Sequence, residues 1–202
     1  MRSTAPTDKG DQTRRHIVTV AAEAFAERGY AGTSLNDVIR ATGLTKGGFY
    51  FHFPSKEALA LEVMHVKQQE WAGKVVTAAA VHPRAIDQLV AMASALVDLH
   101  DTDPTFGSVH ALSRELCTDA DLEPQTSQHL TAWTMLVADV IRRAQIEGDA
   151  KPDVDPDALA DMAVCAFIGI EEISDMHAST GLTMRARVDQ FTGVLLAAIR
   201  PS

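Results

Sequence analysis

Twelve residues, Thr45 to Lys56, constrain what this chain can fold into more than any other stretch. They hold four aromatic residues, two glycines, two lysines and a histidine, whereas aromatic residues make up only 5% of the whole chain. Proline does not fit a helix interior, so a helix that begins after Thr45 has to end before Pro54. Ser55 is a good N-cap for a further helix from Lys56. The stretch therefore predicts a short helix, Lys46 to about Phe51, followed at once by a long helix.

A second short helix is expected immediately before this stretch. Ser34 is a favoured N-cap, and Asp37, three residues later, suits a capping box. The residues from Leu35 to about Thr42 place their apolar side chains at helical spacing. Gly43 then permits a sharp turn. A helix, a glycine turn and a second helix make the helix-turn-helix pattern, in which the second helix enters the major groove of DNA.

The rest of the chain is helical in pattern, and no stretch of useful length alternates like a strand. We expect an all-α protein of nine helices, at about residues 12–28, 35–42, 46–51, 56–80, 83–100, 104–117, 126–147, 156–180 and 183–199. Residues 1–11 are rich in polar residues, glycine and proline and are expected to form a disordered tail. Residues 12–54 would form the helix-turn-helix domain and residues 55–202 a larger helical domain.

The charge of the chain is divided unevenly. Residues 1–56 carry eight Lys or Arg and five Asp or Glu, a net charge of +3, whereas residues 57–202 carry ten and twenty-two, a net charge of -12. Binding to DNA depends on basic groups that lie near phosphates. A double-stranded DNA partner is therefore expected at the N-terminal quarter alone.

Several other classes of protein find little support. No run approaches the roughly 20 apolar residues of a membrane span, and the polar N-terminus has no apolar signal-peptide core, so we expect a cytoplasmic protein without a membrane partner. Cys117 and Cys165 stand singly in apolar helical patterns and are expected to be buried. Glu62 and His65 have the spacing of a di-iron ligand pair, but such a site needs that pair twice. We expect no metal, no cofactor and no catalytic residue.

The residues expected to contact DNA surround the two short helices. They are Thr33, Ser34, Thr45, Lys46, Gly47, Gly48, Phe49, Tyr50, His52 and Lys56. Hydroxyl groups, lysines and free backbone N–H groups at helix starts suit phosphate, and consecutive glycines let the backbone approach another surface. Lys46 alternatively reaches a guanine edge.

Other residues near this surface have competing interpretations. Phe51 and Phe53 are expected to be core residues that anchor the short helix. Ser34 serves equally well as a purely structural cap. Arg14 and Arg15 are either contacts to flanking phosphates or solvated helix charges.

Residues 14–60 resemble the TetR family of bacterial transcriptional repressors. The matching positions are Ile17-x-x-x-Ala21-x-x-x-Phe25-x-x-x-Gly29-Tyr30, then Thr33-Ser34-Leu35-x-x-Val38-Ile39, then Ala41-Thr42-Gly43-Leu44-Thr45-Lys46-Gly47-Gly48-Phe49-Tyr50-x-His52-Phe53-x-Ser55-Lys56-Glu57-x-Leu59. The resemblance implies a homodimer whose first three helices bind operator DNA. It also implies that the fourth to seventh helices enclose a ligand and that the last two helices pair between subunits. Residues 55–202 would thus form a ligand-binding and dimerisation domain.

A narrower resemblance concerns the segment Tyr50-Phe51-His52-Phe53-x-Ser55-Lys56-Glu57. Together with Trp133 in the seventh helix, it is similar to the γ-butyrolactone-receptor branch of the family from actinomycetes. The chain departs from that branch at Gly48-Phe49, where Ala-Leu is expected. The resemblance implies a ligand-responsive repressor that a small apolar effector releases from DNA.

The helices between residues 83 and 180 hold more large, soft side chains than a simple bundle needs. Methionine and aromatic residues adapt to the walls of an apolar pocket, although at helical spacing they also fit an ordinary core. The expected pocket residues are Met92, Leu96, Phe106, His110, Trp133, Val137, Met162 and Cys165. The choice of Trp133 rests on the branch resemblance.

The last two helices are apolar over wide arcs. Such helices either close the core of one chain or pair with a second copy, and the family resemblance favours pairing. The expected dimer residues are Ala163, Ala166, Ile170, Ile173, Phe191 and Leu195. A two-fold dimer would present two reading helices about 34–36 Å apart, one turn of DNA.

Two other functions remain open from the sequence. One is a small all-α enzyme or carrier that keeps a helix-turn-helix corner only for its structure. The other is a DNA-binding regulator without a ligand. A DNA-binding protein loses affinity steeply as salt rises, and a true ligand raises the stability of the folded state, so both alternatives can be separated by experiment.

Overall fold

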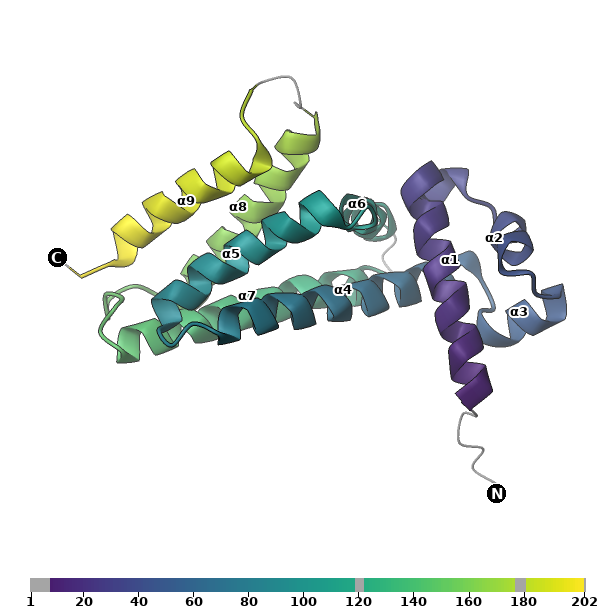
Figure 1. Cartoon of the computed structure of the whole chain (residues 1–202), viewed down its shortest axis with the longest axis horizontal. Coiled ribbons are helices and arrows are strands. Elements are labelled where there is room, and N and C mark those ends of the chain that lie inside the picture. The colour runs from purple at the N-terminus through teal and green to yellow at the C-terminus, as the bar shows by residue number, and fades with distance from the viewer. Residues whose placement is uncertain (1–7, 119–121, 177–180, 202) are drawn as a thin grey trace. The chain divides into compact units, whose positions relative to one another are not determined.

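The computed structural model describes residues 8–118, 122–176 and 181–201, and in these ranges it contains nine α-helices and no strand (Figure 1). The helices are α1 (Asp8–Gly32), α2 (Leu35–Thr42), α3 (Lys46–His52), α4 (Lys56–Ala80), α5 (Ala85–Thr102), α6 (Phe106–Leu116), α7 (Glu123–Ile146), α8 (Pro156–Met176) and α9 (Met184–Ile199). The predicted all-α class is confirmed. No described helix is both long enough and apolar enough to cross a membrane.

Most predicted helix limits agree with the structure, and the differences have local causes. The ranges of α2 and α4 are those predicted. α5 begins at Ala85 rather than at Pro83, because Arg84 is extended (φ -98°, ψ 136°) and occupies the N-cap position. α7 begins at Glu123, ahead of the predicted Thr126, since an acidic residue and a proline are both accepted in a first helical turn. The predicted end of the eighth helix, residues 177–180, lies outside the described ranges.

α1 is longer than predicted at both ends. Residues 8–11, which were expected to belong to a disordered tail, form its first turn, and residues 1–7 of that tail lie outside the described ranges. Gly29 interrupts the helix as expected: its φ of 70° lies in the left-handed region that favours glycine, and its ψ is 168°. The chain then adds one more short turn up to Gly32.

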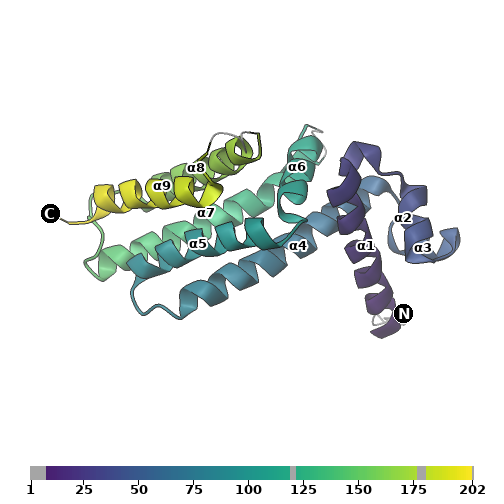
Figure 2. The ribbon, with the colours of Figure 1, turned by 45° about the horizontal axis from the view of Figure 1, so that its top comes forward.

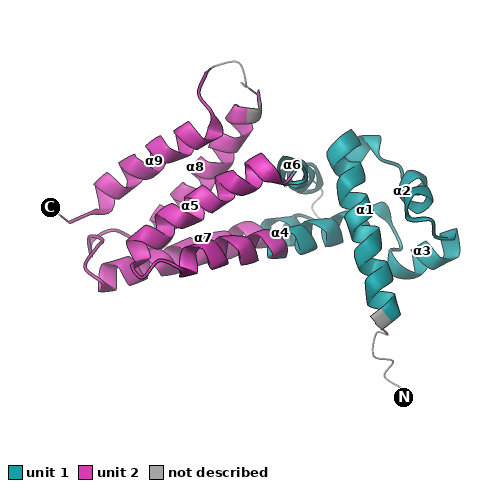
Figure 3. Ribbon diagram, viewed as in Figure 1, with its two compact units in different colours: residues 1–69, 104–127 teal, residues 70–103, 128–202 magenta. Residues whose placement is uncertain are grey.

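The chain divides into two compact units (Figure 3). Unit 1 comprises residues 1–69 and 104–127, and unit 2 comprises residues 70–103 and 128–202. α4 and α7 contribute residues to both units. The units do not follow the division predicted at residues 54 and 55, because the first part of α4 and the whole of α6 belong with the helix-turn-helix. The functional boundary stays a prediction.

The core of unit 1 is built around α1, which packs against α2 and α6. Its buried apolar side chains are Ile17, Val18, Ala21, Ala22, Ala24, Phe25, Val38, Ile39, Phe49, Phe53, Leu59, Ala60, Val63, Met64, Phe106, Val109, Leu112 and Leu116. Full burial of one large apolar side chain contributes about 1.5–3 kcal/mol. Helices as short as α2 and α3 therefore depend on this packing rather than on their own propensity.

Unit 2 is a helical bundle in which α9 packs along both α5 and α8. α8 and α9 lie side by side in Figure 1 and again in Figure 2. Val97, Met184 and Val188 form a buried cluster between these helices. Trp71 is also buried, and its indole N–H donates to Asp103 Oδ2 at 3.0 Å.

One face of α8 is apolar and exposed. Met162, Cys165, Gly169, Ile173 and Met176 recur at steps of three and four residues, so they share one side of the helix, and we call them the outer stripe. Met162 and Met176 are each 66% exposed. The opposite side of α8, which includes Phe167 and Ile170, packs against the cluster of α5 and α9.

Both cysteines are exposed, so the prediction that they are buried is wrong. Cys117 is the C-cap residue of α6, and Cys165 lies on the outer stripe of α8. Each does belong to an apolar helical pattern. A pattern locates a residue on an apolar face, however, and does not say whether that face is turned toward the core of its own chain.

Candidate nucleic-acid interface

α2 and α3 begin and end as their sequences predict. Ser34 is the N-cap of α2, its hydroxyl oxygen accepts from the backbone N–H of Asp37 at 3.2 Å, and the same hydroxyl donates to Asp37 Oδ2 at 2.5 Å. This hydrogen bond and, after it, the nearby Arg40 guanidinium lower the pKa of the Asp37 carboxyl. Gly43 caps the C-terminus of α2 with a φ of 69°, and its N–H donates to Arg40 O.

α3 follows after Leu44, and Thr45 is its N-cap. The Thr45 hydroxyl oxygen accepts from the backbone N–H of Gly48 at 3.2 Å. A methyl group added at Gly48 would lie 3.3 Å from that hydroxyl, so glycine leaves room for the cap. A methyl group at Gly47 would meet no atom within 4 Å. Nothing inside the chain therefore requires glycine at position 47, which lies on the exposed surface.

Phe49 and Phe53 form the buried side of α3. Phe49 is 0% exposed and Phe53 is 1% exposed, with their ring centroids 6.3 Å apart. Phe51 is 86% exposed. The predictions that Phe51 is a core residue and that Phe49 faces DNA are both wrong, because residues two apart on a helix point to different sides and residues four apart share one. Phe53 as an anchor is confirmed.

The outward side of α3 combines small, basic and aromatic residues. Its exposed members are Thr45, Lys46, Gly47, Gly48, Tyr50 and Phe51, which we call the reading face. His52, at the end of the helix, is half-buried, and its ring packs edge-on against Phe51 at 5.3 Å. The sequence prediction missed Phe51 here, although its spacing of two from Phe49 and Phe53 was the available signal.

Thr33 does not belong to this surface. It is 1% exposed, and its hydroxyl donates toward Ala24 O at 3.0 Å and Gly29 O at 2.8 Å. The prediction that Thr33 contacts DNA is therefore wrong. The hydroxyl instead lies against two carbonyl oxygens of α1, close to the point where Gly29 interrupts the helix.

Lys56 is used inside unit 1. Its Nζ donates to Tyr30 O at 2.5 Å and lies 4.0 Å from the centroid of the Tyr30 ring. The Tyr30 hydroxyl in turn donates to Glu57 Oε1 at 3.4 Å. Burial and then the Glu57 carboxylate raise the pKa of Tyr30 to about 12. These interactions join the end of α1 to the start of α4. Contact between Lys56 and DNA stays a prediction.

An N-capped helix, a left-handed glycine turn and a second helix with a small, basic and aromatic outer face define a helix-turn-helix DNA-binding protein. Residues 17–63 match the model of the family described as bacterial regulatory proteins, tetR family. Together with the whole-length similarities below, this shows that the chain belongs to the TetR family of transcriptional regulators, as the resemblance predicted.

Relatives are similar to the chain well beyond its N-terminal segment. It is 28% identical over 193 residues to the HTH-type transcriptional repressor DhaR of Mycobacterium sp. (strain GP1). The aligned region covers 94% of this chain and 93% of that protein. It is 29% identical over 164 residues to the A-factor receptor protein of Streptomyces griseus, covering 81% and 55%. These are regulatory proteins, and no enzyme class is indicated.

A solved structure supports the same assignment. The crystal structure of full-length native TylP, a TetR regulator from Streptomyces fradiae, is similar with a TM-score of 0.72 and 30% identity, covering 96% of this chain and 89% of that one. A receptor from Streptomyces among the relatives is in line with the narrower resemblance to the receptor branch.

The predicted pocket residues are divided between the two units. Phe106 and His110 belong to unit 1, where their rings lie 4.6 Å apart, while the other six belong to unit 2. Met162 and Cys165 lie on the outer stripe, so their prediction as pocket residues is wrong. The remaining four are Met92, which is buried, and Leu96, Trp133 and Val137, which are half-buried.

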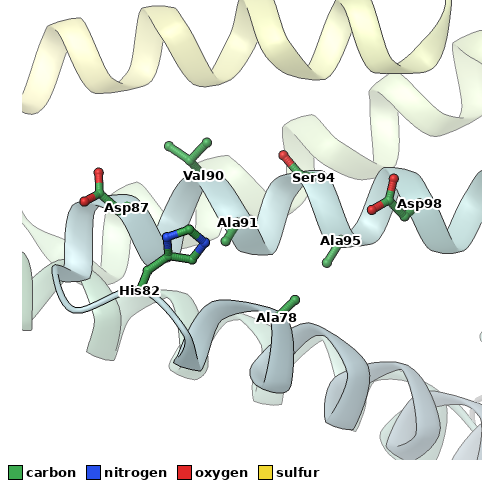
Figure 4. Close-up of a pocket in the computed structure, with 8 residues that line it drawn as sticks. All are labelled: Ala78, His82, Asp87, Val90, Ala91, Ser94, Ala95 and Asp98. Atoms are coloured by element: carbon green, nitrogen blue, oxygen red, sulfur yellow. The ribbon is translucent and has the colours of Figure 1, made fainter.

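One pocket that the structure describes lies elsewhere in unit 2, on the surface between the end of α4 and α5. Its volume is about 500 Å³, and its lining residues are Ala78, His82, Asp87, Val90, Ala91, Ser94, Ala95 and Asp98. Figure 4 shows Ala91 and Ala95 directed toward the end of α4, where Ala78 and His82 lie. None of the eight predicted pocket residues lines this groove. Asp98 at its end is paired with Arg185 at 2.7 Å.

The predicted dimer residues divide between two sides of their helices. Ile173 belongs to the outer stripe, whereas Ile170 is half-buried and packs against the buried cluster of unit 2. On α9, Phe191 and Leu195 are half-buried and share an arc with the buried Val188, so they also turn inward. Ala163 and Ala166 are half-buried at the flanks of the outer stripe. The sequence alone does not fix which arc faces the core, and the dimer residues stay a prediction.

No group of three or more His, Cys, Asp and Glu residues that could hold a metal occurs in the described ranges. The two residues with di-iron spacing have other partners. Glu62 receives hydrogen bonds from Arg14, and His65 Nε2 lies 3.0 Å from Gln69 Nε2.

Because Phe49 is buried and Phe51 is exposed, replacing each by alanine should have different effects on stability. Phe49→Ala should lower the free energy of unfolding by about 3–5 kcal/mol, because it leaves a cavity in the core. Phe51→Ala, the matched control two residues away, should change stability by less than about 0.5 kcal/mol. Urea unfolding followed by circular dichroism measures both. Equal losses in the two variants would contradict the assignment.

Proposed function

We propose that this protein is a ligand-responsive transcriptional repressor, which binds double-stranded operator DNA as a homodimer and is released by a small apolar effector. The observation that carries the DNA-binding part is the reading face of α3. It presents an exposed lysine, two glycines and two exposed aromatic rings on a helix whose opposite side is anchored by Phe49 and Phe53. Such a face suits the major groove.

Each part of the reading face has a chemical task. Lys46, at the first turn of α3, reaches a phosphate or a guanine edge. Gly47 lets the backbone approach the groove, which accounts for a glycine that nothing inside the chain requires. The Tyr50 hydroxyl donates to a phosphate, and the exposed Phe51 ring offers an apolar surface of the kind that meets thymine methyl groups. Thr45 and Ser34 add hydroxyls at helix starts.

The homodimer is proposed to form through the outer stripe of α8. An exposed apolar stripe on a helix of a folded chain marks an interaction surface. α9 also has exposed residues, among them Gly193 and Val194, which is 71% exposed. Small residues such as Gly169 and Gly193 allow helices to approach closely. A second copy of the same surface is self-complementary in a two-fold dimer.

The effector is proposed to bind in unit 2 beside Trp133, with Met92, Leu96 and Val137. Soft and aromatic side chains suit an apolar ligand. α4 begins directly after α3, and the Ser55 hydroxyl at its N-cap accepts from Ala58 N at 3.1 Å. An effector that shifts α4 therefore acts at the helix next to the reading face. The effector has to prefer the state that does not bind DNA, since only differential affinity shifts a population.

The DNA-binding part is tested with a duplex selected from a randomised pool. The affinity of the wild-type protein should fall steeply with salt, by about 0.9 log units per log unit of salt for each phosphate contact. Lys46→Ala should weaken binding about tenfold, as expected for the loss of a charged contact. Lys74→Ala, which removes an exposed lysine from unit 2, should leave binding unchanged. No complex at low salt would refute the proposed function.

The dimer is tested by placing a charge on the outer stripe. Ile173→Asp should raise the dimer dissociation constant tenfold or more, by a rough estimate, because a two-fold interface buries the new carboxylate twice. Val76→Asp is the matched control, since Val76 on α4 is 46% exposed, as Ile173 is. Sedimentation velocity measures both variants. Dissociation by Val76→Asp alone would place the interface on another surface.

The effector is sought by thermal shift among small apolar compounds. A compound at 100 times its Kd should stabilise the folded protein by about 2.7 kcal/mol and should also dissociate the DNA complex. Trp133→Leu should abolish both effects, whereas Ala91→Phe, which fills the groove on α5, should leave them intact. The reverse pattern would place the effector in the groove. Stabilisation without release of DNA would favour the regulator that needs no ligand.

A further inference from the structure

Arg14, in the first half of α1, contacts His52 at the end of α3, Phe53 directly after it and Glu62 on α4. Its Nε donates to Glu62 Oε1 at 3.1 Å, and its second terminal nitrogen lies 3.0 Å from Glu62 Oε2, so one edge of the guanidinium binds both oxygens of the carboxylate. Its other terminal nitrogen donates to His52 O at 3.1 Å. The guanidinium carbon lies 4.3 Å from the centroid of the Phe53 ring.

Each contact restrains the reading helix at the same point. The carbonyl groups in the last turn of a helix lack partners within the helix, and a cation there also opposes the negative end of the helix dipole. At His52, the last residue of α3, Arg14 supplies both a hydrogen-bond donor for the carbonyl group and a positive charge. Phe53, stacked under the guanidinium, is one of the two rings that anchor α3. Glu62 then fixes the guanidinium to α4. Arg14 thus holds the end of α3 to α1 and α4 together.

Arg14 forms an ion pair with Glu62 inside unit 1. The Glu62 carboxylate 3.0 Å away offsets part of the guanidinium's field, so Arg14 attracts a phosphate less strongly than an unpaired arginine would. Arg15, the next residue, is exposed instead. The two neighbouring arginines, alike in sequence, therefore occupy different environments.

Resting on the proposed function, we propose that Arg14 is a positioning residue for DNA reading, which sets the orientation of α3 and does not itself contact phosphate. The bidentate grip on Glu62 and the hydrogen bond to His52 O define its task. A lysine does not reproduce that task, because a single ammonium lacks the planar fork that serves the carboxylate and the carbonyl at once.

Glu62→Ala provides the sharpest test, since the two roles predict changes of opposite sign. Removing a negative charge near DNA strengthens binding if charge alone matters. If Arg14 is a positioning residue, losing its anchor weakens binding about tenfold, as for a charge-assisted hydrogen-bond pair. Glu23→Ala is the matched control, because Glu23 is an exposed acid on α1, and it should leave binding unchanged or slightly tighter.

Variants of Arg14, the other member of the Arg14–Glu62 pair, test the same proposal. Arg14→Lys and Arg14→Ala should both weaken binding about tenfold, with the slope of affinity against salt unchanged. The double variant Arg14→Ala with Glu62→Ala should lose no more than either single variant, because the pair acts as one unit. A drop in slope of about 0.9 per lost phosphate contact for Arg14→Ala, with Arg14→Lys retaining wild-type affinity, would overturn the proposal.

A measurement without DNA covers the case in which a variant folds poorly. Hydrogen exchange of the α3 amides should quicken in Arg14→Lys and Glu62→Ala, while those of α9 stay protected as in the wild type. Unchanged exchange in α3 would overturn the positioning role. If the wild-type protein itself binds no DNA, the proposed function fails. If the wild type binds and Glu62→Ala binds as tightly or more tightly, only this inference fails.

Discussion

Two buried rings one helical turn apart hold the reading helix in place. α3 has only seven residues, and a helix of that length is not stable alone in water. Phe49 and Phe53 supply the packing, the Thr45 hydroxyl satisfies an N–H at one end, and Arg14 satisfies a carbonyl at the other. With one side fixed in this way, helical geometry decides the rest. Lys46, Gly47, Tyr50 and Phe51 have to point outward.

The basic charge of the N-terminal segment is less available than its count implies. Arg14 is paired with Glu62, Lys56 lies against Tyr30, and Arg40 lies 3.2 Å from Asp37. The first two interactions join α1 to α4, and the third lies within α2. Specific recognition then depends on few groups held rigidly rather than on a broad basic surface, which agrees with a net charge of only +3 over residues 1–56.

α8 shows how one helix serves two partners. Its inner side, with Phe167 and Ile170, packs against α5 and α9 within unit 2. Its outer stripe leaves two methionines and an isoleucine exposed. Burying such a stripe against a second copy removes apolar surface from water, and a small residue at Gly169 lets the two helices approach. The proposed dimer would cover this surface.

The sequence by itself determined the helices, the caps and the family. Glycine and proline act locally, so Gly29 interrupts α1, Gly43 caps α2 and Pro54 follows the end of α3 as expected, and Ser34 and Thr45 begin their helices. Local signals of this kind do not need the rest of the chain. The family motif likewise depends on the order and spacing of residues, which the sequence contains in full.

Only the tertiary structure decided which side of each apolar helix faces inward. Phe49 and Phe51 on α3 and Met162 on α8 lie on other sides of their helices than expected, because composition does not reveal rotation about a helix axis. Thr33 is buried in the connection between α1 and α2. The contact between Arg14 and Glu62, which are 48 residues apart, could not be predicted from the sequence either. Contacts over such separations exist only once the helices pack, and packing selects the arc that fits its neighbours.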